Sequence, residues 1–516
     1  MPAGRPRSLL FTGGRVRTGA AGAVGDWALV RDGAIAAVGT GDEPEAKRRI
    51  DLGGATLVPA FCDAHVHLAA TGLHLAGMSF RGERSAARIA AAFAERAASG
   101  TDVLFGGDFE DPLDEPLDRA RLDGAVGDRP ALLTRADLHS CVVSSALLGE
   151  LDLGAVPGVE RDADGRPTGY LREQAAAQAW RWFEAHLPSP QQRSALGRAV
   201  EHAYSKGVSS VHEMHVVDWR GWESLALTRE LADAVPLEVV IYVATAEVGR
   251  VAALGLGRIG GDLFLDGSFG SHSAWLSRPY DPPPPAGVPS NGIGYRSDQE
   301  LLELFTEAQG RGLQVGVHAI GDAAIEQALR TWEAVAERAG TALVHALGHR
   351  IEHFECATDD HMRRAAALGL RASVQPAFDR LWGGRDGMYA RRIGARRAAE
   401  MNRFGSMLRA GLVIGAGSDS TVTPLDPFLQ MASLRAHHRR EERLGAEEAL
   451  AAHTLGAHAL AGNDAARGSI EPGKVADFAV LDRDPVEVDP DELLATEVLE
   501  TWIRGRRVWP EDGSPG

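Results

Sequence analysis

The chain reads Leu57-Val58-Pro59-Ala60-Phe61-Cys62-Asp63-Ala64-His65-Val66-His67, an apolar run that leads directly into two histidines separated by one residue. The run predicts a buried strand over Thr56–Phe61. Residues i and i+2 of a strand point the same way, so we expect both imidazoles to face the same space. Two converging imidazoles suit Zn²⁺, Fe²⁺ or Mn²⁺ better than Mg²⁺ or Ca²⁺. An isolated pair is also common as a coincidence or a polar contact, so its context decides.

Similar apolar runs recur along the chain and alternate with helical stretches, such as the amphipathic residues 322–338. This alternation is typical of βαβ units, and eight such units close most economically into a parallel barrel. The sequence therefore predicts an α/β fold with a (β/α)8 barrel of the TIM type. The eight expected strands are Thr56–Phe61, Val208–His212, Leu237–Val243, Leu263–Asp266, Leu313–His318, His349–His353, Leu370–Gln375 and Leu412–Gly417.

The interval between the first and second expected strands is far too long for a single helix. We expect residues from about 70 to 200 to form an inserted subdomain. Long insertions on the C-terminal face of a barrel usually form part of its pocket. The insertion is therefore predicted to cover the active site.

Both ends of the chain consist of short apolar runs separated by turn residues. Neither end alone has enough strands to close a sandwich, but the two together do. We expect residues 1–56 and 466–516 to form one small composite β-sandwich, with the barrel over residues 57–465. The runs are Leu9–Phe11, Trp27–Val30 and Ile35–Val38 near the start, and Phe478–Leu481 and Val498–Val508 near the end.

The positions of three further residues place the histidine pair in context. His318 ends the fifth expected strand, His353 ends the sixth, and Asp419 follows the eighth. Barrels of this type carry their active sites at the C-terminal ends of the strands. Each residue alone could be a helix cap or a buried structural group. Five ligand-type side chains at one level of the barrel instead predict a metal centre.

With these residues the chain resembles the amidohydrolase superfamily of metal-dependent hydrolases. It is most similar to the branch of N-acyl and N-formyl amide hydrolases with a large insertion after the first strand, the amidohydrolase family 3 type. The resemblance covers nearly all of the chain and is uninformative about the substrate. Its further marks are Asp266-Gly267-Ser268-Phe269-Gly270-Ser271, Val317-His318-Ala319-Ile320-Gly321-Asp322, Arg350-Ile351-Glu352-His353, Gly417-Ser418-Asp419-Ser420 and Gly468-Ser469-Ile470-Glu471-Pro472-Gly473-Lys474-Val475-Ala476-Asp477.

The resemblance implies that His65, His67, His318, His353 and Asp419 form the metal centre. A metal there would lower the pKa of a water molecule to about 7 and polarise the scissile carbonyl. Asp419 would accept the proton of that water and pass it to the departing nitrogen. Zn²⁺ is the favoured cofactor, with Fe or Mn as alternatives, and one or two ions per chain are expected.

Asp262 stands where the chain departs from the family pattern. Many relatives carry a lysine two residues before the Phe-x-Asp-Gly-Ser segment, carboxylated to bridge two metals, and no lysine lies near this position. Asp262 could supply the bridging carboxylate directly, or it could be a turn residue after Gly260-Gly261. In a one-metal site, His65, His67, His318 and Asp419 would be the ligands. His353 would then be an electrostatic or proton-transfer group, and so a second catalytic residue beside Asp419.

Five further residues are candidates for contact with substrate. Two lie in the insertion, and the others follow expected strands or the Asp-Gly-Ser segment. Each has a structural interpretation at least as simple, as a surface, core or loop residue. The candidates are His139, Glu173, His212, His272 and Trp275.

Composition limits the partners. The 516 residues carry a net charge of −17, which argues against a nucleic-acid surface. Cys62, Cys141 and Cys356 form no CxxC pair, as is typical of a reducing cytoplasm. No run reaches the roughly 18 apolar residues of a membrane span, and no signal-peptide pattern is present. We expect a cytoplasmic protein that acts on a small molecule, without nucleic-acid or membrane partners. A homo-oligomer is compatible with the sequence.

We therefore predict an enzyme that hydrolyses non-peptide C–N bonds, with an N-acyl or N-formyl amide as the first candidate substrate. A cyclic amide or imide is the next candidate. A deaminase would use the same metal site on an amidine carbon. A metal-binding relative without turnover is a further alternative, against which the retained Asp419 argues. No GxSxG elbow or phosphate-binding glycine motif supports another chemistry.

Overall fold

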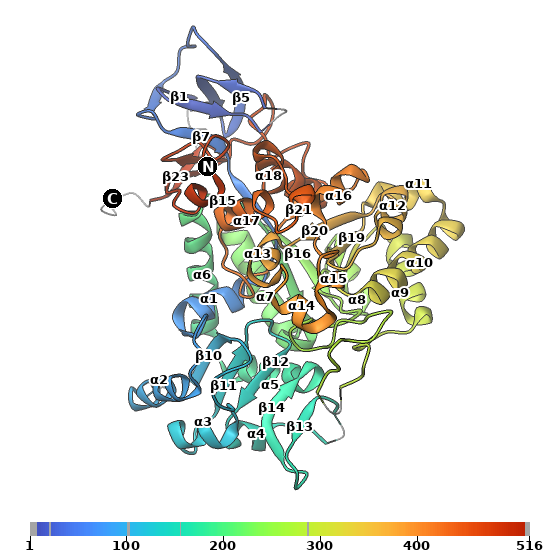
Figure 1. The fold of residues 1–516 in the computed structure, drawn as a ribbon. Coiled ribbons are helices and arrows are strands. Elements are labelled where there is room, and N and C mark those ends of the chain that lie inside the picture. The colour runs from blue at the N-terminus through green and yellow to red at the C-terminus, as the bar shows by residue number, and fades with distance from the viewer. Residues whose placement is uncertain (1–7, 20–21, 101–103, 155, 286–287, 511–516) are drawn as a thin grey trace.

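An eight-stranded parallel sheet lies at the centre of the molecule (Figure 1). The computed structural model describes residues 8–19, 22–100, 104–154, 156–285 and 288–510. The two edges of the sheet meet where Val66 bridges Ser420 and the Asp419 N–H donates to the His65 carbonyl at 2.8 Å. The predicted (β/α)8 barrel is thereby confirmed. Its strands are β8 (Phe61–Val66), β15 (Val208–Val216), β16 (Glu238–Ala244), β17 (Arg258–Ile259), β18 (Gln314–Ala319), β19 (Arg350–His353), β20 (Arg371–Val374) and β21 (Val413–Ala416).

Amphipathic helices cover the outside of the barrel. In α10 (Asp322–Ala339), Trp332 is fully buried and stacks on Phe305 of α9 (Asp298–Gly310), with 4.3 Å between ring centroids. Helix α9 begins at a capping box in which Ser297 and Glu300 bond each other's backbone N–H groups. No helix within the described ranges is long and apolar enough to cross a bilayer. The covering helices also include α6 (Ser189–Ser205), α12 (Asp359–Ala367), α16 (Phe404–Arg409) and α17 (Pro427–Arg435).

The first barrel strand begins later than expected. The run predicted as one strand is split at Ala60: β7 (Thr56–Pro59) pairs with the terminal strand β22 (Phe478–Leu481), and only then does β8 enter the barrel. Backbone bonds mark the crossing, because the Ala60 N–H donates to Asp477 while the Phe61 N–H donates to Gly207. An apolar run does not reveal which of two sheets each half joins.

The fourth barrel strand also differs from the prediction. It is the short β17, and the expected segment 263–266 contributes only a single bridge, between Phe264 and His318. Gly260 and Gly261 lie between, with φ of 83° and 73°. A Cβ at Gly260 would lie 2.0 Å from the Gly316 carbonyl oxygen, so only glycine fits this turn. The turn breaks the strand directly before Asp262.

Two further sheets contain strands from the chain ends (Figure 1). Phe11, Phe478 and Trp502 pack edge to face between them, with centroids 5.1–5.2 Å apart. The predicted pairing of the two ends is therefore present, while the exact domain boundaries stay a prediction. One sheet holds β1 (Ser8–Thr12), β4 (Trp27–Arg31), β5 (Ala34–Gly39) and β6 (Arg48–Asp51). The other holds β2 (Arg15–Arg17), β3 (Val24–Gly25), β7, β22, β23 (Val498–Ile503) and β24 (Arg506–Trp509).

The segment between α1 (Leu68–Ala76) and α6 forms a lobe on the opposite side of the barrel from the terminal sheets (Figure 1). Its apolar core is continuous with strand-end loops of the barrel, since Leu132 and Val143 share one cluster with Ile320 and Phe378. The lobe therefore packs on the C-terminal ends of the strands. It consists of β9 (Met78–Ser79), β10 (Leu104–Phe109), β11 (Ala131–Arg135), β12 (Ser140–Val143), β13 (Val159–Arg161) and β14 (Pro167–Arg172) with α2 (Ala86–Ala98), α3 (Arg119–Val126), α4 (Ser145–Glu150) and α5 (Glu173–His186).

Candidate metal centre

The structure brings all six predicted metal-centre residues together at the C-terminal ends of the barrel strands. Every one is at most 6% exposed. They come from five places in the sequence that meet only because the barrel closes. The residues are His65 at the end of β8, His67 just after it, Asp262 after β17, His318 in β18, His353 at the end of β19 and Asp419 after β21.

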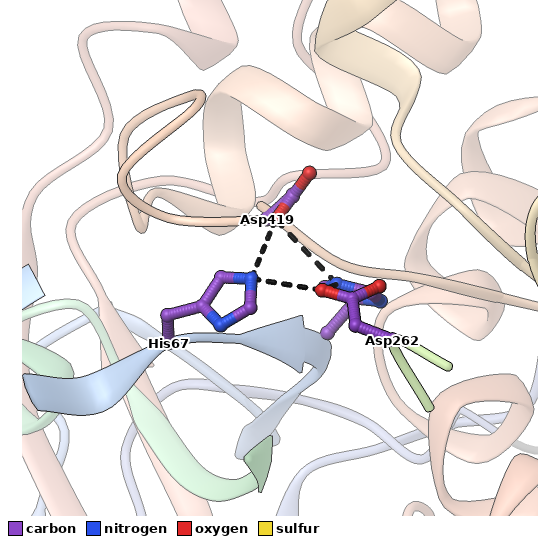
Figure 2. Close-up of side chains that lie close together, drawn as sticks. His67, Asp262 and Asp419 are labelled. Atoms are coloured by element: carbon purple, nitrogen blue, oxygen red, sulfur yellow. Dashed lines mark hydrogen bonds and ion pairs between the residues drawn. The ribbon is translucent and has the colours of Figure 1, made fainter. Parts of the chain in front are cut away.

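One group of ligand atoms lies between β8 and the β21 loop (Figure 2). Asp262 Oδ2 lies 3.1 Å from His67 Nε2 and 3.3 Å from His65 Nε2. Asp419 Oδ1 lies 3.3 Å and 3.5 Å from the same two nitrogens. Ligand atoms around a tetrahedral Zn²⁺ with bonds of about 2.0–2.1 Å stand roughly 3.3 Å apart. The four side chains thus have the spacing of a coordination shell.

A second group shares Asp262 with the first. Its other oxygen, Oδ1, lies 3.5 Å from His318 Nδ1 and 3.6 Å from His353 Nε2. All three atoms are buried, and none has a hydrogen-bond partner. Buried polar atoms are nearly always paired, so three unpaired ones that face each other fit a cation between them. Asp262 has the placement expected of a carboxylate that bridges two metal ions.

In each of the four histidines, the ring nitrogen that does not face the other ligand atoms (the outer nitrogen) lies near an oxygen atom. A histidine that donates from one ring nitrogen presents a lone pair on the other, which is the form that binds metal. The inner nitrogens are therefore prepared for ligation. The outer contacts are His67 Nδ1 to the Met214 carbonyl (3.0 Å), His65 Nδ1 to Glu352 (3.1 Å), His353 Nδ1 to Gln375 (2.7 Å) and His318 Nε2 to the Gly267 carbonyl (3.4 Å).

Asp63 and Glu352 hold the loops of the centre in place. The Asp63 carboxylate accepts the N–H groups of His65 (3.1 Å) and Ser418 (2.9 Å), which ties the end of β8 to the Asp419 loop. Burial opposes the charge of Glu352, but the Arg350 guanidinium at 2.7 Å lowers the pKa of this carboxyl to about 2. Glu352 therefore stays an acceptor for His65.

The centre is electrostatically suited to cations. Burial opposes protonation of His67, yet hydrogen bonds to the Asp262 and Asp419 carboxylates raise the pKa of its imidazole to about 9. Burial opposes ionisation of Asp262, yet His65 above all, together with His318 and His353, holds the pKa of this carboxyl well below its usual range. Two ionised carboxylates in a buried site attract positive charge, whether protons or metal ions.

Backbone strain is concentrated at the centre. His353, Phe354 and Asp419 have φ of 69°, 53° and 52°, in the left-handed region that side chains other than glycine rarely adopt. Such strain costs of order 1–3 kcal/mol per residue and persists where the surroundings impose it. Here it directs the His353 and Asp419 side chains towards the other ligands.

Two cavities border the centre, and His139 lines both. One reaches Asp419 and His353 and is walled largely by apolar side chains. The other lies against His139 and Glu173, whose side chains are joined by a 2.9 Å contact between Nδ1 and Oε2. We call them the apolar cavity and the Arg296 cavity. The apolar walls of the first include Phe269, Phe378, Trp382, Met388, Tyr389 and Val422, and the second is lined also by Trp219, Phe264, Tyr295 and Arg296.

The other three candidate substrate contacts line neither cavity. His212 lies inside the barrel, where its Nδ1 accepts from Arg350 at 2.8 Å. His272 packs against the Tyr280 ring at 5.3 Å. The Trp275 N–H donates to Asp266 at 2.8 Å. Their contact with substrate stays a prediction. For His212, a strand-end position does not reveal whether the side chain faces the mouth or the interior of the barrel.

Two aromatic residues beside the metal centre, Phe264 and Trp219, were not identified from the sequence. Phe264 packs on His318 with centroids 4.8 Å apart, and Trp219 lies 6.0 Å from His67. Their only sequence signal is proximity to strand ends, since Trp219 follows β15 and Phe264 lies two residues after Asp262. That signal is too common to single them out.

The chain is similar to known hydrolases. The putative amidohydrolase YtcJ of Bacillus subtilis is 28% identical over 455 residues, which are 81% of this chain and 81% of that protein. The N-substituted formamide deformylase of Arthrobacter pascens is 26% identical over 504 residues, 87% of this chain and 88% of that protein. The crystal structure of an uncharacterised metal-dependent hydrolase from Pyrococcus furiosus superposes with a TM-score of 0.73 at 26% identity, covering 93% of this chain and 100% of that chain.

A family model described as the amidohydrolase family matches residues 48–509. The match includes the whole barrel, the inserted lobe and the strands β6, β7, β22, β23 and β24 of the terminal sheets. It confirms the resemblance that the sequence motifs carry. The chain therefore belongs to the amidohydrolase family and has the fold of a metal-dependent hydrolase.

Proposed function

We propose that this enzyme hydrolyses a non-peptide C–N bond, with an N-formyl or N-acyl amide as its substrate. The observation that carries the proposal is Asp419, which lies 3.3–3.5 Å from the His65 and His67 nitrogens and also lines the apolar cavity. A carboxylate at that junction can serve both the metal centre and the substrate. The similarity to an N-substituted formamide deformylase supports the N-formyl class.

The six residues of the centre would hold one or two divalent ions, for which we propose Zn²⁺ because imidazole and carboxylate ligands suit it. Such an ion supplies a Lewis acid and lowers the pKa of water. Asp419 accepts a proton from the attacking water as general base and returns it to the leaving nitrogen as general acid. The amide and water thereby become a carboxylic acid and an amine. The apolar cavity holds the substrate's apolar part and excludes bulk water.

The experiment combines metal analysis with a substrate screen. We expect purified enzyme to release an amine from N-formyl or N-acetyl compounds, to lose this activity on chelation and to regain it with Zn²⁺. Asp419→Asn should keep the fold and lose nearly all turnover, because the amide cannot accept the proton. Asp477→Asn serves as the control, since Asp477 is comparably buried and its carboxylate contacts Arg467 and the Arg504 N–H, not the Asp419 loop. Activity that survives complete metal removal would contradict the proposal.

The alternatives have distinct outcomes in the same screen. Turnover of cyclic imides or lactams alone would indicate the ring-opening class, and release of ammonia from an amino-substituted heterocycle would indicate a deaminase. A protein that holds metal but turns over none of these would be the non-catalytic relative.

A further inference from the structure

The Arg296 cavity is a second chamber of about 190 Å³, and it shares His139 in its wall with the apolar cavity. Phe264 lines this chamber, and its ring packs on His318 at 4.8 Å and on Trp219 at 5.2 Å. Trp219 in turn lies against His67, with centroids 6.0 Å apart. Two residues that line the chamber therefore lie next to metal-centre histidines, which makes the chamber a neighbour of the centre.

Arg296 is an uncompensated cation in the wall of this chamber. No carboxylate of the described residues lies within 4.0 Å of its guanidinium, and its Nε is buried without a hydrogen-bond partner. Burial lowers the pKa of Arg296, while Asp218 and Glu300 oppose this only from longer range. Buried charges are usually paired, so a partly desolvated guanidinium without a close counter-charge has donors available for an anionic ligand.

The acidic side chains of the chamber are already engaged. Glu173 pairs with His139 at 2.9 Å, and the exposed Asp218 lies 3.7 Å from Arg181. Neither neutralises Arg296 at close range. Their presence nevertheless disfavours a doubly charged ligand such as a phosphate ester, so a single carboxylate fits the local charge better.

The backbone around Arg296 is held firmly. The Tyr295 N–H donates to the Leu265 carbonyl at 2.9 Å, which ties the segment to the Asp262–Asp266 region. The Arg296 carbonyl accepts from Gln327 at 2.8 Å, and the next residue caps α9. A guanidinium on a fixed backbone beside a reaction centre can position a ligand rather than merely attract it.

We propose that Arg296 binds a carboxylate of the substrate, so that the enzyme acts on N-formyl or N-acyl amino acids or closely related amido acids. This inference rests on the proposed function and extends it to a substrate class. A guanidinium binds a carboxylate in a bidentate, planar geometry. Trp219 and Phe264 flank the chain between that carboxylate and the scissile bond at the metal centre.

The test compares N-formylphenylalanine with N-formylphenylalaninamide, which differ only in the carboxylate. Wild-type enzyme should prefer the acid, and Arg296→Gln should lose about 10- to 100-fold in kcat/KM for the acid alone, mainly through KM. Arg296→Lys should retain part of the preference. Arg311→Gln is the control, because it removes a positive charge directly after α9 that pairs with Glu307 and does not line the chamber. It should leave the preference unchanged.

A binding measurement separates this inference from the proposed function. Phenylacetate carries the carboxylate and the ring without a scissile amide, and calorimetry should show it binding to wild type about tenfold or more tightly than to Arg296→Gln. If neither amide is hydrolysed but phenylacetate binding depends on Arg296, the carboxylate site stands and the C–N hydrolase proposal fails. Equal turnover of acid and amide, or phenylacetate binding that is absent or unchanged in Arg296→Gln, would overturn the carboxylate site.

Discussion

Asp262→Asn tests whether one carboxylate serves two metal ions. The substitution keeps the shape of the side chain and removes its charge. Its two oxygens lie 3.1–3.6 Å from four histidine nitrogens, two on each side, close to the roughly 3.3 Å between ligands of a tetrahedral ion. If both oxygens are ligands, the variant should fall from about two metal ions per chain towards one.

The size of the effect follows from the burial of the site. Two unit charges 4 Å apart interact by about 4 kcal/mol at an effective dielectric constant of 20, and a dication beside a carboxylate interacts more strongly. Asp262 is only 3% exposed, so water screens little of this. The loss of about 4 kcal/mol or more corresponds to at least ~1,000-fold weaker binding of one ion. Turnover should fall by orders of magnitude with it.

The assay is metal content per chain after dialysis against a weak chelator, alongside kcat/KM on the substrate found in the screen. Asp477→Asn again controls for the loss of a buried carboxylate elsewhere, and thermal unfolding confirms that each variant is folded. A wild type with a single ion, together with normal activity of Asp262→Asn, would refute the bridge. Asp262 would then be a turn residue after Gly260-Gly261, and the one-metal arrangement would hold.

Three further predictions follow from the same structure. His67→Ala should abolish activity and lower bound metal, measured by turnover and elemental analysis, and retained metal with full turnover would contradict it. Deletion of residues 477–516 should leave insoluble protein, because it removes β22 and the buried Trp502; a soluble, cooperatively unfolding truncation would count against it. The third concerns acid stability: burial, aided by Arg371, lowers the pKa of His349 to about 3 from 6.5. Below pH 6.5 His349 therefore binds a proton in the unfolded chain but stays neutral in the native state. The free energy of unfolding thus decreases as the pH falls from 6.5 towards 3. This group alone should cost about 2 kcal/mol at pH 5 relative to pH 7.5. In denaturant titrations His349→Gln should show a smaller pH difference than wild type, and an identical difference would exclude His349 as the cause.

Much of the fold could be predicted because its signals are local. Apolar runs and the helical stretches between them indicate βαβ units, and eight such units leave few alternatives to a closed barrel. The errors arose where local patterns are ambiguous. The run 56–61 belongs to two sheets, and the fourth strand ends at Gly260 instead of extending over 263–266. Hydrophobicity marks burial, but it does not reveal which neighbour a strand pairs with.

The candidate site shows the same division. Its histidines and Asp419 could be named because they follow strands, and the structure gathers them as expected, although their metal-binding role stays a prediction. Trp219, Phe264 and Arg296 could not be named, because each becomes significant only through a neighbour distant in the sequence. His212 satisfied the same strand-end pattern, yet its ring lies in the barrel interior beside Arg350.

The sequence by itself determined the family, the barrel and the residue types of the metal centre, because these depend on periodicity and on motifs within short stretches. Only the tertiary structure decided that Asp262 has one oxygen towards His65 and His67 and the other towards His318 and His353. It also decided that Arg296 lines a chamber without a counter-charge at close range. Both are matters of direction and distance between segments far apart in the chain, which barrel closure and the Gly260-Gly261 turn impose together.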